Sequence, residues 1–309
     1  KKEYTSAVNE FQLAIDLNSR LAESYRAEGI AYYSEKAYPE AIAAFSRSLN
    51  NMDDPDKEFK KDVQFYLAQA RMDYGEVDKA IEVYSEILKA GEDEQAFFLR
   101  GKAYISMEDY KNAEKDFQRA LEGCEDYNLY INIYQIYVDH NKAVDGDAYL
   151  KMALELEPQD GEDCYHRGRI YEYEKNYEAA RDELKTAMEQ GYEDAMLLLG
   201  RVYLEMEDPA SARSMYQEYL QKSEQGAKAY NGLAMCDIYD GAYDSALENI
   251  AQGLKENSKE DEQGLLYNEI VAYEYKRDFA TAKEKMKIYL EQYPEDEAAL
   301  RENEFLSTR

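Results

Sequence analysis

The chain has 309 residues, and 37 basic against 66 acidic side chains give it a formal net charge of −29. This charge repels phosphate backbones and anionic membrane surfaces, so we expect no nucleic-acid partner. Apolar residues make up 45% of the chain, which argues against disorder despite the charge. No apolar run reaches the length of a membrane span, so we expect no direct insertion of this segment into a membrane.

The sequence begins at Lys1 rather than at a methionine, and no signal peptide is visible. An upstream targeting or anchoring segment therefore stays open, and with it the compartment: cytoplasmic, or the extracytoplasmic face of the cell envelope. Cys124, Cys164 and Cys236 form no CxxC pair and fall in separate parts of the chain, so we expect free thiols. The residues do not indicate an oligomeric state.

The stretch Glu94–Glu125 carries the pattern that organises the chain. Apolar or small residues recur three, four or seven positions apart in two segments, which predicts two amphipathic helices separated near Glu108. Arg100 is the exception on this apolar face. A helical hairpin this short cannot bury both of its faces, so it requires neighbours of the same kind. The pattern positions are Phe97, Gly101, Tyr104, Tyr110, Ala113, Phe117 and Ala120.

The same unit recurs along the chain. Its copies begin near residues 22, 61, 94, 127, 161, 193, 227 and 263, in steps of 39, 33, 33, 34, 32, 34 and 36 residues. We therefore expect a single array over 1–309, with eight helix–turn–helix repeats at 22–294. The second helix of a truncated repeat is expected at 1–21, and a capping helix at 295–309.

The fourth repeat departs most from the pattern. Tyr134 stands where glycine or alanine is usual, and Gly146 stands where alanine is usual. Bulk in a close-packed place costs about 1–3 kcal/mol unless the helices move apart. We therefore predict a local change of helix angle within residues 127–160.

The repeat pattern resembles that of the tetratricopeptide repeat family, whose unit of about 34 residues is a helix–turn–helix with this order of aromatic and small residues. The resemblance extends over essentially the whole chain. It implies an all-α fold, a right-handed superhelical solenoid whose inner wall is made by the first helix of each repeat. Some family members bind chaperone C-termini through a carboxylate clamp, but the corresponding places here hold Arg26, Ile30 and Tyr66, which do not reproduce it.

Catalysis is not expected. The two histidines, His140 and His166, fall in different repeats, and no HExxH, GxGxxG, GxxxxGK[ST] or GxSxG motif occurs. The acidic loop at 51–62 lacks the central glycine and terminal glutamate of a calcium-binding EF-hand. We expect no metal ion and no cofactor.

The exposed face of the first helices combines aromatic groups, which anchor partners, with several cations. We predict that this concave groove binds a peptide or protein segment, so that the protein acts as a non-enzymatic scaffold. Two other functions stay open: the peptide-sensing domain of a regulator, and an accessory subunit of an enzyme complex. The candidate groove residues are Tyr33, Phe65, Phe98, Lys102, Gln135, Tyr165, Arg169, Arg201, Lys228, Asn231 and Tyr267.

Four of these residues are predicted to receive an acidic side chain or a C-terminal carboxylate, because guanidinium, ammonium and amide groups donate hydrogen bonds to carboxylates. The alternative is that the cations pair with neighbouring acids such as Glu172 and Glu205, while the tyrosines pack between repeats. The four residues are Arg169, Arg201, Lys228 and Asn231.

Overall fold

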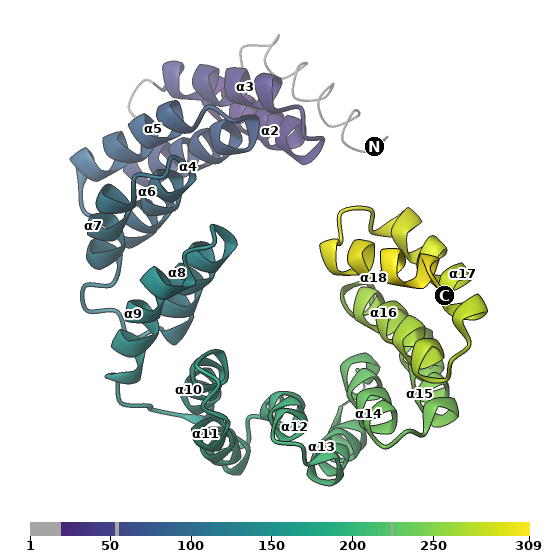
Figure 1. Ribbon diagram of the computed structural model, residues 1–309. Helices are drawn as coiled ribbons and strands as arrows, with labels where there is room; N and C mark the ends of the chain where they lie inside the picture. Colours follow the sequence, from purple (N-terminus) through teal and green to yellow (C-terminus); the bar gives the residue numbers. More distant parts are fainter. Residues whose placement is uncertain (1–19, 53–55, 224) are drawn as a thin grey trace. The chain divides into compact units, whose positions relative to one another are not determined.

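The computed structural model describes residues 20–52, 56–223 and 225–309 (Figure 1). The half repeat predicted at 1–21 lies outside these ranges, except for its last two positions. The described residues form 17 α-helices and no strand. The helices are α2 (Leu21–Ser34), α3 (Tyr38–Asn50), α4 (Lys57–Tyr74), α5 (Val77–Ala90), α6 (Glu94–Ser106), α7 (Tyr110–Ala120), α8 (Tyr127–Asp139), α9 (Ala143–Leu154), α10 (Gly161–Tyr173), α11 (Tyr177–Glu189), α12 (Ala195–Glu205), α13 (Pro209–Lys222), α14 (Ala227–Tyr239), α15 (Tyr243–Lys255), α16 (Lys259–Tyr275), α17 (Phe279–Gln292) and α18 (Glu297–Ser307).

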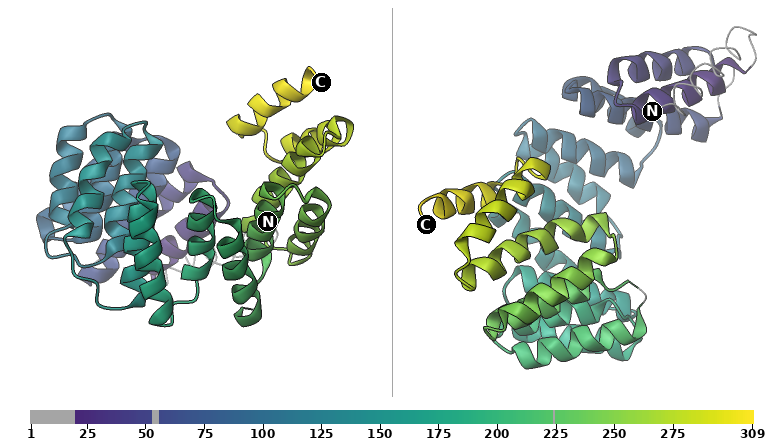
Figure 2. Two further views of the ribbon diagram at one scale, coloured as in Figure 1. Left: turned by 60° about the horizontal axis from the view of Figure 1, so that its bottom comes forward. Right: turned by 90° about the vertical axis from the view of Figure 1, so that its right-hand side faces the viewer.

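The helices are arranged as successive helix–turn–helix pairs, from α2 with α3 to α16 with α17, and α18 follows the last pair (Figures 1 and 2). The all-α fold of paired helices is therefore confirmed. Pro39 and Pro209 lie in the first turns of α3 and α13, where the missing N–H has no helical partner to lose. No helix in the described ranges is both long and apolar enough to cross a membrane.

The chain divides into two compact units, residues 1–152 and 153–309, and the division falls inside α9. Within each unit, every helix pair packs against the next. The first helices of neighbouring pairs also touch one another directly, as α12 touches α14 and α14 touches α16. The first helices of a unit thus form a layer of their own, which is where the sequence places the binding face. The single array over 1–309 stays a prediction.

Each described helix pair turns through one residue in the left-handed region of backbone space. In the first pair this residue is Lys36, with φ 59°, and the next N–H, that of Ala37, donates to the carbonyl of Tyr32 at 2.9 Å. This Schellman hydrogen bond satisfies a carbonyl that the helix end leaves free. Glycine occupies two of the eight positions, and the other six carry a side chain. The positions are Lys36, Gly75, Glu108, Asn141, Lys175, Glu207, Gly241 and Arg277.

The helices of a pair approach closely where a small residue of the first faces a large residue of the second. A Cβ added to Gly101 would lie 2.6 Å from the Phe117 ring, and one on Gly29 would lie 2.6 Å from the Phe45 ring. These distances are too short for any side chain, so glycine is required at both places. The two glycines therefore let the helices of each pair approach closely.

In the fourth repeat a large residue of the first helix faces a glycine of the second. Gly146 of α9 faces Tyr134 of α8, because a Cβ on Gly146 would lie 3.0 Å from Cδ2 of Tyr134. The two departures from the pattern therefore compensate for one another, and Tyr134 is not the uncompensated bulk that we assumed from the sequence. The change of helix angle within 127–160 stays a prediction.

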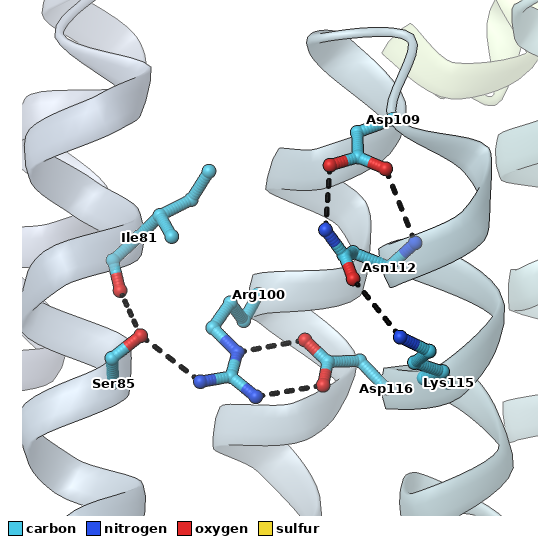
Figure 3. A network of polar contacts seen from close by, with 7 residues as sticks. All are labelled: Ile81, Ser85, Arg100, Asp109, Asn112, Lys115 and Asp116. Atoms are coloured by element: carbon cyan, nitrogen blue, oxygen red, sulfur yellow. Dashed lines mark hydrogen bonds and ion pairs between the residues drawn. The ribbon is translucent and has the colours of Figure 1, made fainter.

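Arg100, the exception on the apolar face of α6, lies in a polar network (Figure 3). Its Nε and Nη2 atoms each donate to a carboxylate oxygen of Asp116 on α7 at 2.7 Å, and its Nη1 donates to the Ser85 hydroxyl of α5 at 2.9 Å. The Arg100 and Asp116 side chains are only 18% and 7% exposed. The arginine thus joins the second helix of one repeat to both helices of the next.

Asp116→Ala should lower the free energy of unfolding by about 3 kcal/mol, because it leaves the Arg100 guanidinium buried without its carboxylate. Glu92→Ala is the matched control in the same unit. Glu92 pairs with Arg119 but is 78% exposed, so its removal should cost less than about 1 kcal/mol. Chemical denaturation measures both. Equal losses in the two variants would show that burial of the Arg100 pair contributes nothing.

Glu108→Gly should raise the midpoint of thermal unfolding by roughly 2 °C. A side chain in the left-handed region costs about 1–2 kcal/mol, and the larger unfolded-state entropy of glycine offsets only part of that gain. Gly75→Ala should lower the midpoint, and no atom lies within 4 Å of the added Cβ, so the change reports backbone strain alone. Shifts in the same direction in both variants would contradict the strain argument.

Candidate functional site

A cavity of about 970 Å³ lies among α12, α14 and α16 of the second unit. Helical spacing brings its wall together: Lys228, Asn231 and Met235 share one face of α14, and Gly264 and Asn268 share one face of α16. The turns between repeats complete the rim. The lining residues are Tyr165, Asp194, Leu197, Leu198, Arg201, Leu204, Glu205, Tyr216, Tyr219, Gln225, Gly226, Ala227, Lys228, Asn231, Gly232, Met235, Glu256, Ser258, Glu260, Asp261, Gly264 and Asn268.

Four of the residues predicted from the sequence meet in this cavity: Tyr165, Arg201, Lys228 and Asn231. Arg169 is not part of the wall, but its guanidinium lies 5.9 Å from the centre of the Tyr165 ring, and its Nη1 lies 3.2 Å from Nδ1 of the buried His166. Burial raises the pKa of Tyr165, and Arg169, Arg201 and Lys228 oppose that rise. The three predicted cations therefore act on the same ring.

The other predicted residues are not in the cavity. Tyr267 packs against Tyr289, with ring centres 5.8 Å apart. The remaining five lie on first helices of the other unit, and their role in a groove stays a prediction. They are Tyr33 (α2), Phe65 (α4), Phe98 and Lys102 (α6) and Gln135 (α8).

The three aromatic residues in that group contact other helices: Tyr33 contacts the next repeat, as the alternative expects, while Phe65 and Phe98 contact the second helix of their own repeat. The Tyr33 hydroxyl donates to the Asp73 carboxylate. The ring centre of Phe65 lies 6.4 Å from that of Tyr84 on α5, the second helix of the same repeat. Phe98 contacts its own second helix in the same way, with its ring centre 6.1 Å from that of Phe117.

Both cations in the cavity wall are paired with acids. Arg201 donates to Glu172 at 2.7 Å, as the alternative reading expects, and Lys228 donates to Glu260 at 3.1 Å. Glu205 instead accepts from the Tyr177 hydroxyl at 3.2 Å. Lys228 is 53% exposed and its partner Glu260 is 80% exposed, so that pair contributes only about 0–1 kcal/mol. Arg201 is 58% exposed, but its partner Glu172 is only 15% exposed. An incoming carboxylate can therefore take the place of Glu260 at small cost, while Arg201, with five N–H donors, can donate to a second carboxylate without releasing Glu172.

The acidic side chains of the cavity are the part that sequence reasoning missed. Two cations face five carboxylates, most of them in turns between repeats or in the first turn of α16. Glu260 and Asp261 follow Ser258 at the α16 N-terminus, where the helix dipole favours negative charge. That local signal predicts acids at a helix start, but it does not show which cavity they face. The five are Asp194, Glu205, Glu256, Glu260 and Asp261.

Two facing amides supply polar groups without charge. Asn268 Nδ2 donates to Asn231 Oδ1 at 2.7 Å. Within the described residues this is the sole hydrogen bond of either side chain, so Asn231 keeps its amide N–H donors and Asn268 keeps its amide oxygen. Gly264 has no side chain to cover these amides. A Cβ at this position would lie 3.4 Å from Asn231 Nδ2, in van der Waals contact with it. A donor beside an acceptor matches the N–H and C=O of an extended backbone.

Family models of the tetratricopeptide repeat match residues 94–126, 165–227 and 197–262. This chain is a tetratricopeptide repeat protein. The matches include one repeat of the first unit and most of the helices that form the cavity. No curated protein sequence matches the chain.

Solved structures show the same fold. The crystal structure of yeast Tom70 is 16% identical, with a TM-score of 0.54, and the match covers 94% of this chain and 75% of that one. A tetratricopeptide repeat protein from Parabacteroides merdae is 12% identical, with a TM-score of 0.51, and the match covers 82% of this chain and 100% of that one. At these identities the likeness concerns the solenoid of helix pairs alone.

Tetratricopeptide repeats are typically non-catalytic scaffolds that bind proteins or peptides. Among the described residues of this tetratricopeptide repeat protein, no three His, Cys, Asp or Glu side chains are placed to hold a metal ion.

Two carboxyl groups near the C-terminal end of the chain interact strongly with each other. Burial, together with the neighbouring Glu302 of α18, raises the pKa of Glu274 on α16 to about 7. Glu274 does not line the cavity, so its raised pKa reflects the packing of α18 against the last repeat.

Glu274 should make the protein less stable as the pH rises from 5 to 8. Its pKa is higher in the folded than in the unfolded chain, so the folded state holds a proton that the unfolded state has already released, and that advantage is lost as the pH passes about 7. The difference in stability between Glu274→Gln and the unmodified protein should therefore favour the variant more at pH 8 than at pH 5. Thermal unfolding at both values measures this.

The control for this prediction is Glu284→Gln, at an exposed position of α17. Its stability relative to the unmodified protein should be the same at both pH values. A difference between the two pH values that is no larger for Glu274→Gln than for Glu284→Gln would contradict the prediction.

Proposed function

We propose that this protein is a non-enzymatic scaffold that binds an extended peptide segment of a partner protein in the cavity of the second unit. The segment's carboxylate, at its C-terminus or on an acidic side chain, lies at Arg201, Lys228 and Asn231. The observation that carries the proposal is the amide pair Asn231–Asn268, which presents a donor and an acceptor side by side in a cavity wide enough for a peptide.

The cations add the second element of recognition. Arg201 and Lys228 come from neighbouring first helices, α12 and α14, and both are half-exposed at the same cavity. Because Lys228 holds a solvated acid, Glu260 at 80% exposure, the protein exchanges one carboxylate for another at this residue when the segment binds. Arg201 keeps the mostly buried Glu172 and donates to the segment with its other N–H groups. A neutral ligand gains nothing from that exchange.

The five carboxylates of the wall restrict the segment further. Like charges placed together in a cleft repel one another, so a polyacidic segment is disfavoured. We therefore expect the bound segment to carry one carboxylate at the cations and neutral or basic residues on either side of it.

The double variant Arg201→Gln, Lys228→Gln should bind such segments about tenfold more weakly. Each lost charge-assisted hydrogen bond to the bound carboxylate contributes about 1.5–3 kcal/mol, and the cost of removing water from the charged groups offsets part of that. The probes are two panels of short peptides of mixed sequence, one with a free C-terminal carboxylate and one with a C-terminal amide. Fluorescence anisotropy with the full chain measures affinity for both panels.

The matched control is the double variant Lys222→Gln, Arg301→Gln. It makes the same change in net charge at exposed, ion-paired positions of α13 and α18 that do not line the cavity. This control should bind as tightly as the unmodified protein. Equal weakening in the two double variants would reduce the effect to net charge, and unchanged affinity in both would place the peptides elsewhere.

A further inference from the structure

Tyr216 occupies a position that is otherwise a core contact. In each repeat, the residue four places after the small residue of the second helix fills the space beside the first helix. In six of the eight repeats this residue is Phe, Leu, Ile or Met, and in the other two it is tyrosine. In chain order the residues are Phe45, Tyr84, Phe117, Leu150, Leu184, Tyr216, Ile250 and Met286.

The Tyr216 ring lies between two glycines on different first helices. A Cβ on Gly200 of α12 would lie 2.5 Å from the ring atom Cζ, and a Cβ on Gly232 of α14 would lie 2.3 Å from the same atom. Both glycines thus face the end of the ring that carries the hydroxyl. Tyr216 reaches from α13 through the slot that the two missing side chains leave, and its hydroxyl lies on the side of the first helices.

The hydroxyl of Tyr216 ends at the cavity without a partner. Tyr216 is 4% exposed and is part of the cavity wall. Its hydroxyl makes no hydrogen bond within the part of the chain that the structure describes. The neighbouring Tyr219 differs, because its hydroxyl donates to Asp194 at 3.5 Å. The hydroxyl is not one of the fully buried polar atoms that lack a partner in the described residues, so it opens onto the cavity, where an incoming group can accept its hydrogen bond.

The surroundings select the kind of group. Burial raises the pKa of Tyr216 far above its ordinary value, so the hydroxyl stays neutral and keeps its proton to donate. The formally charged side chain that acts on it is the guanidinium of Arg201, which lowers the pKa. A neutral O–H donor near a guanidinium favours an anionic oxygen and disfavours a cation.

We propose that the Tyr216 hydroxyl donates a hydrogen bond to the carboxylate of the bound peptide, next to Arg201. This inference rests on the proposed function and adds a binding residue to it from the second-helix layer. The Gly200–Gly232 slot then has a role in recognition, since a Cβ on either glycine would displace the ring and withdraw its hydroxyl from the cavity.

Tyr216→Phe tests the inference, because it keeps the ring in its slot and removes one oxygen. The variant should unfold at the same temperature as the unmodified protein or a higher one, since no hydrogen bond inside the protein is lost. Its affinity for the carboxylate peptides should fall about tenfold. Affinity for the amide peptides should fall less, so the preference for a free carboxylate shrinks.

Tyr84→Phe is the matched control. It makes the same chemical change at the equivalent position of the second repeat, in the other unit, and should leave both affinities unchanged. Carboxylate peptides that bind Tyr216→Phe as tightly as the unmodified protein would overturn the inference while leaving the proposed function intact. The proposed function, and the inference with it, would be overturned if the unmodified chain bound neither panel of peptides. The same holds if the Arg201→Gln, Lys228→Gln variant bound the peptides with unchanged affinity.

Discussion

The close approach of two helices at a small residue is the constraint on which the rest of this structure depends. At Gly101 and Gly29 the opposing ring lies where a Cβ would be, so the first helix can carry no side chain there. The large residue then fills the gap between two backbones, and dispersion contacts on both sides of the ring hold the pair together. Most repeats solve this problem in the same way, which is consistent with the nearly constant period of the sequence.

That constraint also explains how the fourth repeat accommodates the unusual residues Tyr134 and Gly146. Tyr134 and Gly146 lie against each other, so the missing Cβ of Gly146 leaves room for the Tyr134 ring. From the sequence, each residue was compared with the usual residue at its own position, and both looked costly. The compensation appears when the two are compared with each other.

The fold could be predicted from the sequence because it depends on residue spacing and size. Helix pairs, turns and the small–large contacts all follow from a period of about 34 residues and from the positions of glycine and alanine. The partners of charged groups could not, since they depend on the orientation of side chains from different repeats. Arg100 was recognisable as an exception, but nothing in the spacing identifies Ser85 and Asp116 as its partners.

The candidate site was predictable in part for the same reason. Helical spacing placed Tyr165, Arg201, Lys228 and Asn231 on first helices, and these four meet in one cavity. It also placed Tyr33, Phe65 and Phe98 on first helices, where they pack between helices, because an aromatic residue at that spacing serves either purpose. Most acids of the cavity lie in turns or at the start of α16, outside the periodic pattern, so the spacing does not show which cavity they face.

Tyr216 shows how a binding group can arise in a layer devoted to packing. The space between the two first helices exists because Gly200 and Gly232 have no side chains, and the Tyr216 ring fills it. Phenylalanine would fill it equally, so the oxygen brings no packing benefit. The oxygen opens onto the cavity and has no hydrogen-bond partner within the described residues. It is therefore available to an occupant of the cavity that accepts a hydrogen bond.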